Sequence, residues 1–151
     1  MSGRKFKVSI GEGKVTPEFI VKENDKIIME CRELISDSTV GSKNVVVFRV
    51  VFGPGAEHSK HRHINCDEMV YCISGRGAEG IKENKGEYKE YEYTPGTVMY
   101  VPKGVAHYTR NLDYFEPFVC IGIFPGISNM DKNTTGYETM GEISLKDRVL
   151  K

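Results

Sequence analysis

Three of the four histidines in the chain lie within six residues of one another, and a glutamate follows them. They are His58, His61 and His63, followed by Glu68. Side chains at positions i and i+2 of a strand face the same side, about 6.6 Å apart. His61 and His63 can therefore lean onto one ion at about 2.1 Å from each nitrogen. A turn at 64–67 would bring Glu68 back opposite the pair, and His107 is the remaining histidine for a fourth ligand.

A His-x-His pair is also common on the exposed face of a strand, so the neighbouring glycines and prolines matter. Gly55 stands six residues before His61, and Gly75 stands seven after Glu68. A second pattern, G-x5-P-x-G-x2-H-x3-N, is formed by Gly96, Pro102, Gly104, His107 and Asn111. These two patterns resemble the two motifs of the cupin family, at 55–75 and 96–111. Every fixed position of both motifs is present.

The resemblance implies an all-β protein, the cupin β-barrel or double-stranded β-helix of the jelly-roll class. It also implies one divalent transition metal per chain, held by His61, His63, Glu68 and His107. Three neutral imidazoles and one carboxylate suit Fe, Mn, Zn, Ni, Co or Cu and suit Mg or Ca poorly. An octahedral ion with these ligands keeps two open positions and a site charge of about +1, which favours carboxylate or enolate oxygens.

The rest of the chain fits a barrel of short strands. Glycine and proline interrupt it at short intervals, between runs rich in Val, Ile, Tyr and Phe. We predict strands at 26–33, 44–52, 68–73, 77–82, 87–93, 97–101 and 116–124. The charged segment 82–92 predicts a solvated hairpin that turns at 84–86. Ser144 is expected to cap one short helix at 144–150. We predict one domain over 1–151, with 1–40 and 126–151 as extensions of the barrel.

Four further residues are candidates for a role near the metal. Arg49 is the only charge in the apolar run 45–52; its fork could grip a substrate carboxylate, or it could pair at a subunit edge. Tyr100 could supply a phenol to the pocket or simply pack. His58 could lie at the rim of the site or on a solvated loop. Cys66 could be a reactive thiol near the pocket mouth or a turn residue without chemical role.

Strand alternation also predicts which neighbours of the ligands face the interior. Counting from Glu68 and His107 gives Val70, Cys72, Thr109 and Asn111. Val70 and Cys72 offer little acid or base chemistry, and Asn111 is expected to stabilise a turn. This favours chemistry carried out by the metal itself. The expected function is a metal-dependent enzyme acting on a small oxygenated anion, as a dioxygenase or a decarboxylase. The alternative is a non-catalytic, metal-containing cupin that binds a small molecule.

Composition limits the partners and the location. The chain has 21 Lys and Arg against 21 Asp and Glu, whereas a non-specific nucleic-acid binder needs a basic excess. The longest apolar run, 118–124, is far shorter than the roughly 20 residues that span a bilayer. The N-terminal residues lack an apolar segment, and the four cysteines have no C-x-x-C spacing, so we expect a cytoplasmic protein with reduced thiols. Apolar strand faces outside the barrel predict a homodimer.

Overall fold

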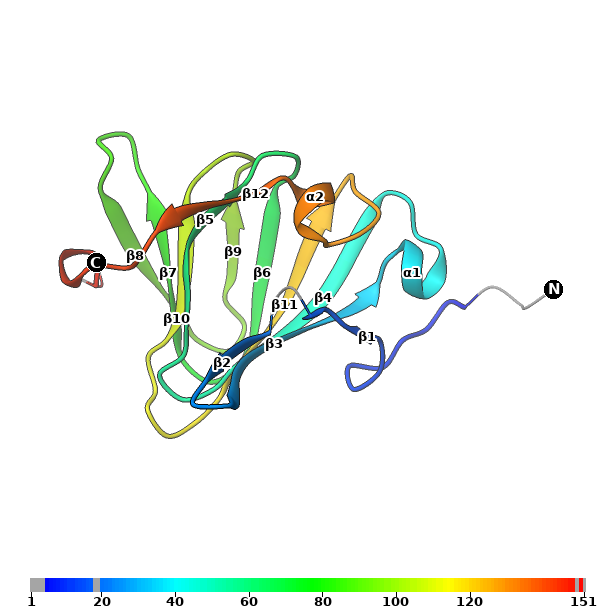
Figure 1. Ribbon diagram of the computed structural model, residues 1–151, viewed down its shortest axis with the longest axis horizontal. Coiled ribbons are helices and arrows are strands. Elements are labelled where there is room, and N and C mark those ends of the chain that lie inside the picture. The colour runs from blue at the N-terminus through cyan, green and yellow to red at the C-terminus, as the bar shows by residue number, and fades with distance from the viewer. Residues whose placement is uncertain (1–4, 18–19, 149, 151) are drawn as a thin grey trace.

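The computed structural model describes residues 5–17, 20–148 and 150, and it consists mainly of β strands in two antiparallel sheets that face each other (Figure 1). One sheet has seven strands in the order β1-β3-β4-β11-β6-β9, with β2 paired to β3. The other has five strands in the order β12-β5-β10-β7-β8. This arrangement confirms the predicted all-β fold of the jelly-roll class.

The strands are β1 (Lys14–Val15), β2 (Val21–Glu23), β3 (Lys26–Ile35), β4 (Val45–Phe52), β5 (Glu57–His63), β6 (Glu68–Ser74), β7 (Gly77–Lys82), β8 (Tyr88–Tyr93), β9 (Val98–Val101), β10 (His107–Asn111), β11 (Phe118–Pro125) and β12 (Tyr137–Gly141). Two short helices, α1 (Asp37–Val40) and α2 (Lys132–Thr135), interrupt them. The seven predicted strands all occur, with ends displaced by no more than two residues. The helix expected at 144–150 is shorter, a 3₁₀ turn at Leu145–Asp147.

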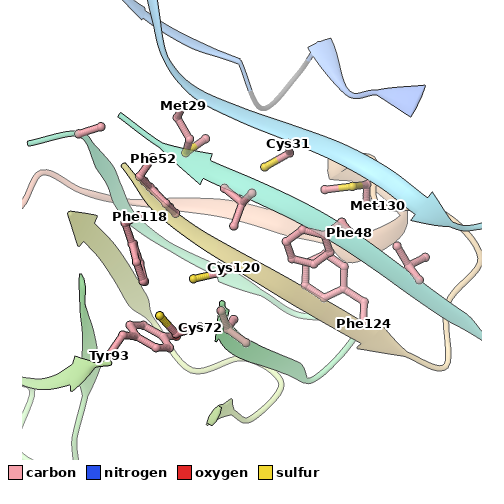
Figure 2. Packing of buried hydrophobic residues seen from close by; sticks show 14 of the residues in the cluster. Met29, Cys31, Phe48, Phe52, Cys72, Tyr93, Phe118, Cys120, Phe124 and Met130 are labelled. Carbon is pink, nitrogen blue, oxygen red and sulfur yellow. The ribbon is translucent and has the colours of Figure 1, made fainter. Parts of the chain in front are cut away.

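The core lies between the sheets and comes chiefly from alternate residues of β4 and β11. Phe48 stacks on Phe124 with ring centroids 4.9 Å apart, and Phe52 stacks on Phe118 at 5.7 Å (Figure 2). The opposite residues of β4 are only partly covered. The strand is apolar on both faces, but only its inner face is buried.

The C-terminal segment covers the outer side of the five-stranded sheet. The Tyr108 hydroxyl donates to Glu90 Oε1 (2.6 Å) and to the Asp147 carbonyl (2.8 Å). Arg110 makes two hydrogen bonds to Glu90, and Lys60 pairs with Asp147 at 2.7 Å. Glu90 is fully buried by these contacts, so the charged hairpin is solvated only in part. The contacts brace β5 and β10, the strands that carry the histidines.

The outer side of the seven-stranded sheet carries large apolar side chains on β6 and β9. Tyr71 and Ile73 on β6 are 44% and 36% exposed, and Val98 and Tyr100 on β9 are 61% and 57% exposed. Tyr71 lies opposite Val98, and Met69 lies opposite Tyr100, so these side chains form one continuous surface, here called the apolar face.

Among the helices in the described part of the chain, none is long and apolar enough to cross a membrane.

Gly122 lets an aromatic ring fill the centre of the core. A Cβ atom at this position would lie 2.0 Å from the Phe48 ring, far inside van der Waals contact. We expect Gly122→Ala to lower the free energy of unfolding by about 1–3 kcal/mol through overpacking. Urea denaturation measures this effect. Gly11→Ala is the control, because its Cβ meets no atom within 4 Å; equal losses in both variants would contradict the packing argument.

Candidate metal centre

Three histidines meet inside the barrel because β5 and β10 are neighbours. His107 lies directly opposite His61, and His63 follows two residues later on the same face. The ring centroids are 4.2 Å apart for His61 and His107, and 5.1 Å apart for His61 and His63. All three rings are buried, and one nitrogen from each lies within 4.8 Å of the other two. One ion can be contacted by all three imidazoles.

Backbone hydrogen bonds set the orientation of two of these rings. Nδ1 of His61 lies 2.7 Å from the Ser59 carbonyl, and Nδ1 of His107 lies 2.9 Å from the Val105 carbonyl. A ring whose Nδ1–H donates to a carbonyl can present Nε2 to a metal, as is usual for metal-bound histidines. His63 Nδ1 is buried without a hydrogen-bond partner, and the buried His107 Nε2 has only the Glu68 carboxylate beside it. A metal ion would give both nitrogens a ligand bond.

The opposite sheet contributes Glu68, the first residue of β6. Its Oε1 lies 3.2 Å from His107 Nε2. At this separation both atoms can bind one ion at about 2.1 Å from each. Glu68, Glu79 and His107 form a second buried group with ligand atoms within 4.8 Å of one another. Three of the four predicted ligands, His61, His63 and His107, thus form one group, and Glu68 meets this group at His107 together with a second carboxylate, Glu79 on β7.

Burial determines the protonation of this site. Burial lowers the pKa of His63 to about 4, and burial with the neighbouring His58 lowers that of His61 well below its usual range. Burial opposes protonation of His107 too, but the adjacent Glu68 carboxylate outweighs it and raises the pKa of His107 to about 9. Burial alone would raise the pKa of Glu68, but His107 outweighs that effect and lowers it. Burial raises the pKa of Glu79 to about 7.

A small cavity of about 40 Å³ lies against the ligands. Apart from the histidines, Glu68 and Thr109, its walls are apolar or thiol side chains: Cys31, Phe48, Val50, Phe52, Val70, Phe124 and Met130. No Lys or Arg from the described part of the chain lines it. An anion in this cavity would be recognised chiefly by the metal.

His58 separates this cavity from a wider groove of about 460 Å³ and lines both. The register between β5 and β10 shifts between His58 and His61, so that His58 pairs with Thr109 while His61 pairs with His107. This bulge turns His58 toward the ligands, and its ring stacks on His61 at 4.0 Å. Tyr137 on β12 stacks on His61 at 5.1 Å, and its hydroxyl lies 3.3 Å from His58 Nε2. The rim position weighed for His58 is the one observed.

Two candidates lie away from the cavity. Arg49 points to the outer side of β4, where its Nη2 is 3.9 Å from Glu30 Oε1. Tyr100 belongs to the apolar face. Neither residue is brought to the metal ligands, so their placement does not support direct contact with a substrate there. Pairing of Arg49 at a subunit edge stays a prediction.

Cys66 and Asn111 have no chemical role at the metal ligands in this structure. Cys66 is buried, and burial raises the pKa of its thiol to about 12, which leaves it unreactive at neutral pH. Asn111 donates to the carbonyls of Gly53 and Glu116 and accepts from the Asp113 amide. It joins two loops, 53–56 and 112–117, as expected for a turn-stabilising residue.

Sequence reasoning missed Cys31, Glu79, Met130 and Tyr137 at this site. Glu79 had a usable signal, since it is the only acidic residue inside the predicted strand 77–82. Tyr137 and Met130 come from the segment after the barrel, and no local pattern indicates that it returns to the metal site.

Residues 38–138 match the family model described as Cupin. The chain therefore belongs to the cupin family. It is 36% identical to oxalate decarboxylase OxdC of Bacillus subtilis over 92 residues, which are 60% of this chain and 24% of that protein. It is 25% identical over 136 residues to glucose-6-phosphate isomerase of Thermococcus litoralis, covering 85% of this chain and 70% of the isomerase.

Solved structures show the same fold. A structure of Bacillus subtilis oxalate decarboxylase superposes with a TM-score of 0.71 at 20% identity, covering 93% of this chain and 33% of that one. An oxalate oxidase structure gives a TM-score of 0.62 at 17% identity, covering 74% and 55%. The chain thus spans about a third of the decarboxylase, and the resemblance at these identities establishes the fold alone.

Acid is expected to destabilise the metal-free protein through His61 and His63. Both stay neutral when folded, whereas the unfolded chain protonates them below about pH 6.5. Stability should fall from about pH 6.5 toward pH 4, by up to about 1.4 kcal/mol per pH unit for each ring. His107, with its raised pKa, is protonated in both states below about pH 5.5 and adds nothing there. His58, whose pKa burial lowers to about 3, adds a third ring of the same sign. Glu79 acts in the opposite direction, because its pKa is raised to about 7 when folded, and it offsets about one ring between about pH 4.5 and 7.

Urea denaturation at several pH values, with a chelator present, tests this. His63→Asn should reduce the slope by up to about 1.4 kcal/mol per pH unit, because one titrating ring is removed. A free energy of unfolding that stays constant between about pH 6.5 and about pH 5 would contradict the neutral, buried state of these rings.

Proposed function

We propose that this cupin is a metal-dependent enzyme that acts on a small oxygenated anion, as a decarboxylase or a dioxygenase. The observation that carries the proposal is the cavity of about 40 Å³ that opens directly onto the histidines and Glu68. A probe volume of this size holds about three or four water-sized groups. It suits a carboxylate of a few heavy atoms and is too small for a hexose phosphate.

The residues present would hold a transition metal through His61, His63, Glu68 and His107. When bound, the metal supplies Lewis acidity and the positive charge that attracts an anion. The chain contributes a cavity with apolar walls, which keeps water out and strengthens electrostatic attraction inside it. Thr109, whose hydroxyl donates to Glu79 at 2.7 Å, is a polar group of the cavity wall outside the predicted ligand set.

Oxalate is the first substrate to test, because the chain resembles oxalate decarboxylase over its motif region. Manganese is the first metal to load, since the Mn(II) centres of the Bacillus subtilis enzyme have been studied structurally. We expect about one metal per chain by elemental analysis, and consumption of oxalate with release of carbon dioxide. His61→Ala combined with His107→Ala should abolish both.

Two other outcomes of this experiment are informative. Full metal occupancy in the double variant would overturn the ligand assignment. Normal metal binding without turnover of oxalate or of other small 2-oxo and 2-hydroxy acids would instead favour the alternative, a non-catalytic cupin that binds a small molecule.

A second candidate function is sugar-phosphate isomerisation. Several curated relatives are glucose-6-phosphate isomerases, and the groove beside His58 carries Lys60 and Lys132, which could attract a phosphate. Against this, the groove also contains Glu57 and Glu142, and Lys60 already pairs with Asp147. Conversion of fructose 6-phosphate by the metal-loaded protein would select this function over the first.

We also propose that the protein is a homodimer formed through the apolar face. Exposed apolar side chains on adjacent strands are costly in water, and a two-fold axis lets the same surface cover itself. Light scattering should give twice the 17.0 kDa chain mass. Val98→Glu should produce monomers, whereas Leu145→Glu, at a still more exposed position on the C-terminal turn, should not. A wild-type monomer at micromolar concentration would contradict the proposal.

A further inference from the structure

Glu79 is a buried carboxylate with one oxygen unaccounted for. Its Oε2 accepts hydrogen bonds from the hydroxyls of Thr109 (2.7 Å) and Tyr93 (3.2 Å). Its Oε1 is buried and has no hydrogen-bond partner. Within the described residues, no Lys or Arg forms an ion pair with it. A carboxylate removed from water needs compensating charge or hydrogen bonds, and half of this group has neither.

The position of Glu79 places its carboxylate beside the predicted metal ligands. Glu79 pairs with Thr109 across β7 and β10, so it shares the inner face with His107, two residues away from Thr109. Ligand atoms of Glu68, Glu79 and His107 lie within 4.8 Å of one another. Two atoms on opposite sides of one ion, each at about 2.1 Å, are about 4.2 Å apart. Side-chain shifts of about 1 Å or less would therefore bring all three onto one ion.

We propose that Glu79 is a fifth protein ligand of the metal, in addition to His61, His63, Glu68 and His107. His107 belongs to both buried groups, the imidazole triad and the triad with the two carboxylates. An ion bound by His107 is therefore adjacent to both groups. Glu79 Oε1, which has no hydrogen-bond partner, and His107 Nε2, which has only the Glu68 carboxylate 3.2 Å away, are the two atoms that this ion would satisfy. The inference rests on the metal centre of the proposed function and is independent of the reaction.

This ligand set changes what the site can accept. Five protein donors leave an octahedral ion one open position instead of two, so a substrate carboxylate would bind through a single oxygen. The second carboxylate brings the formal charge of a dication with neutral imidazoles from +1 to zero. Three nitrogens and two oxygens also make a harder donor set, which favours Mn or Fe over Cu.

The test is a titration of the metal-free protein with Co(II), whose visible absorption reports its coordination number. Glu79→Gln keeps the size of the side chain and can still accept from Thr109 and Tyr93, but it lacks the charge. We expect Co(II) to bind about 10–100-fold more weakly, a loss comparable to that for other residues that support a metal site. The absorption should also intensify, because fewer ligands surround the ion.

The matched control is Glu90→Gln. Glu90 is equally buried on the adjacent strand β8, but it is bonded to Arg110 and Tyr108 and belongs to neither ligand group. This variant, or the exposed Glu92→Gln on the same strand if Glu90→Gln does not fold, should leave the Co(II) affinity and spectrum unchanged. A metal-bound protein should also gain less thermal stability in Glu79→Gln than in the control.

The outcomes separate this inference from the proposed function. If the wild-type chain binds no Co(II) or Mn(II), the metal centre itself fails, and this inference fails with it. If wild type and Glu79→Gln bind equally with the same spectrum, Glu79 is not a ligand and the metal centre stands. If Glu79→Gln does not fold, Glu79→Asp decides, because it keeps the charge but withdraws the oxygen. Unchanged binding in that variant, or failure of both to fold, overturns the assignment.

Discussion

The burial of imidazole and carboxylate groups inside an apolar barrel is the constraint on which the rest of this structure depends. Polar groups removed from water must be matched by hydrogen bonds, opposite charges or an ion. The backbone carbonyls of Ser59 and Val105 match one nitrogen of His61 and one of His107. The carboxylates of Glu68 and Glu79 lie beside His107, and Glu79 Oε1 has no hydrogen-bond partner. A metal ion is the partner that satisfies them together.

The two sheets contribute unequally to this space. The five-stranded sheet carries the three histidines of the predicted ligand set and Glu79, whereas Glu68 comes from the seven-stranded sheet. An ion bound by both would link the sheets across the barrel, as the contact between the rings of His63 and Phe124, with centroids 4.9 Å apart, does beside it. The C-terminal segment holds β5 and β10 from outside through Lys60 and Tyr108. The site is therefore supported by elements distant from it in sequence.

The parts of the site that follow from local strand patterns could be predicted from the sequence, and the parts that depend on distant elements could not. The histidine spacing, Glu68 and His107 are local patterns within strands and turns, and strand alternation correctly placed Val70 and Thr109 on the cavity wall. His58 was harder, because its direction depends on a bulge that simple alternation does not contain. Arg49 stood out as the one charge in an apolar run, yet that run has a covered and an open face, and alternation alone does not say which one Arg49 occupies. Tyr137 reaches His61 only through a long-range return of the chain.

The apolar walls of the cavity leave the choice of bound anion to the metal and its ligands. Phe48, Phe52 and Phe124 provide no group that recognises an anion, so affinity must come from the metal and its ligands. In such a low-dielectric space the charge of the ligand set has a large effect on what binds, because fewer water molecules screen it. A site charge near zero would bind a monoanion through one oxygen and release an anionic product readily. A site charge of +1 would hold a bidentate anion more tightly. The number of carboxylates on the metal, rather than the shape of the apolar wall, would then determine how firmly a small acid is held.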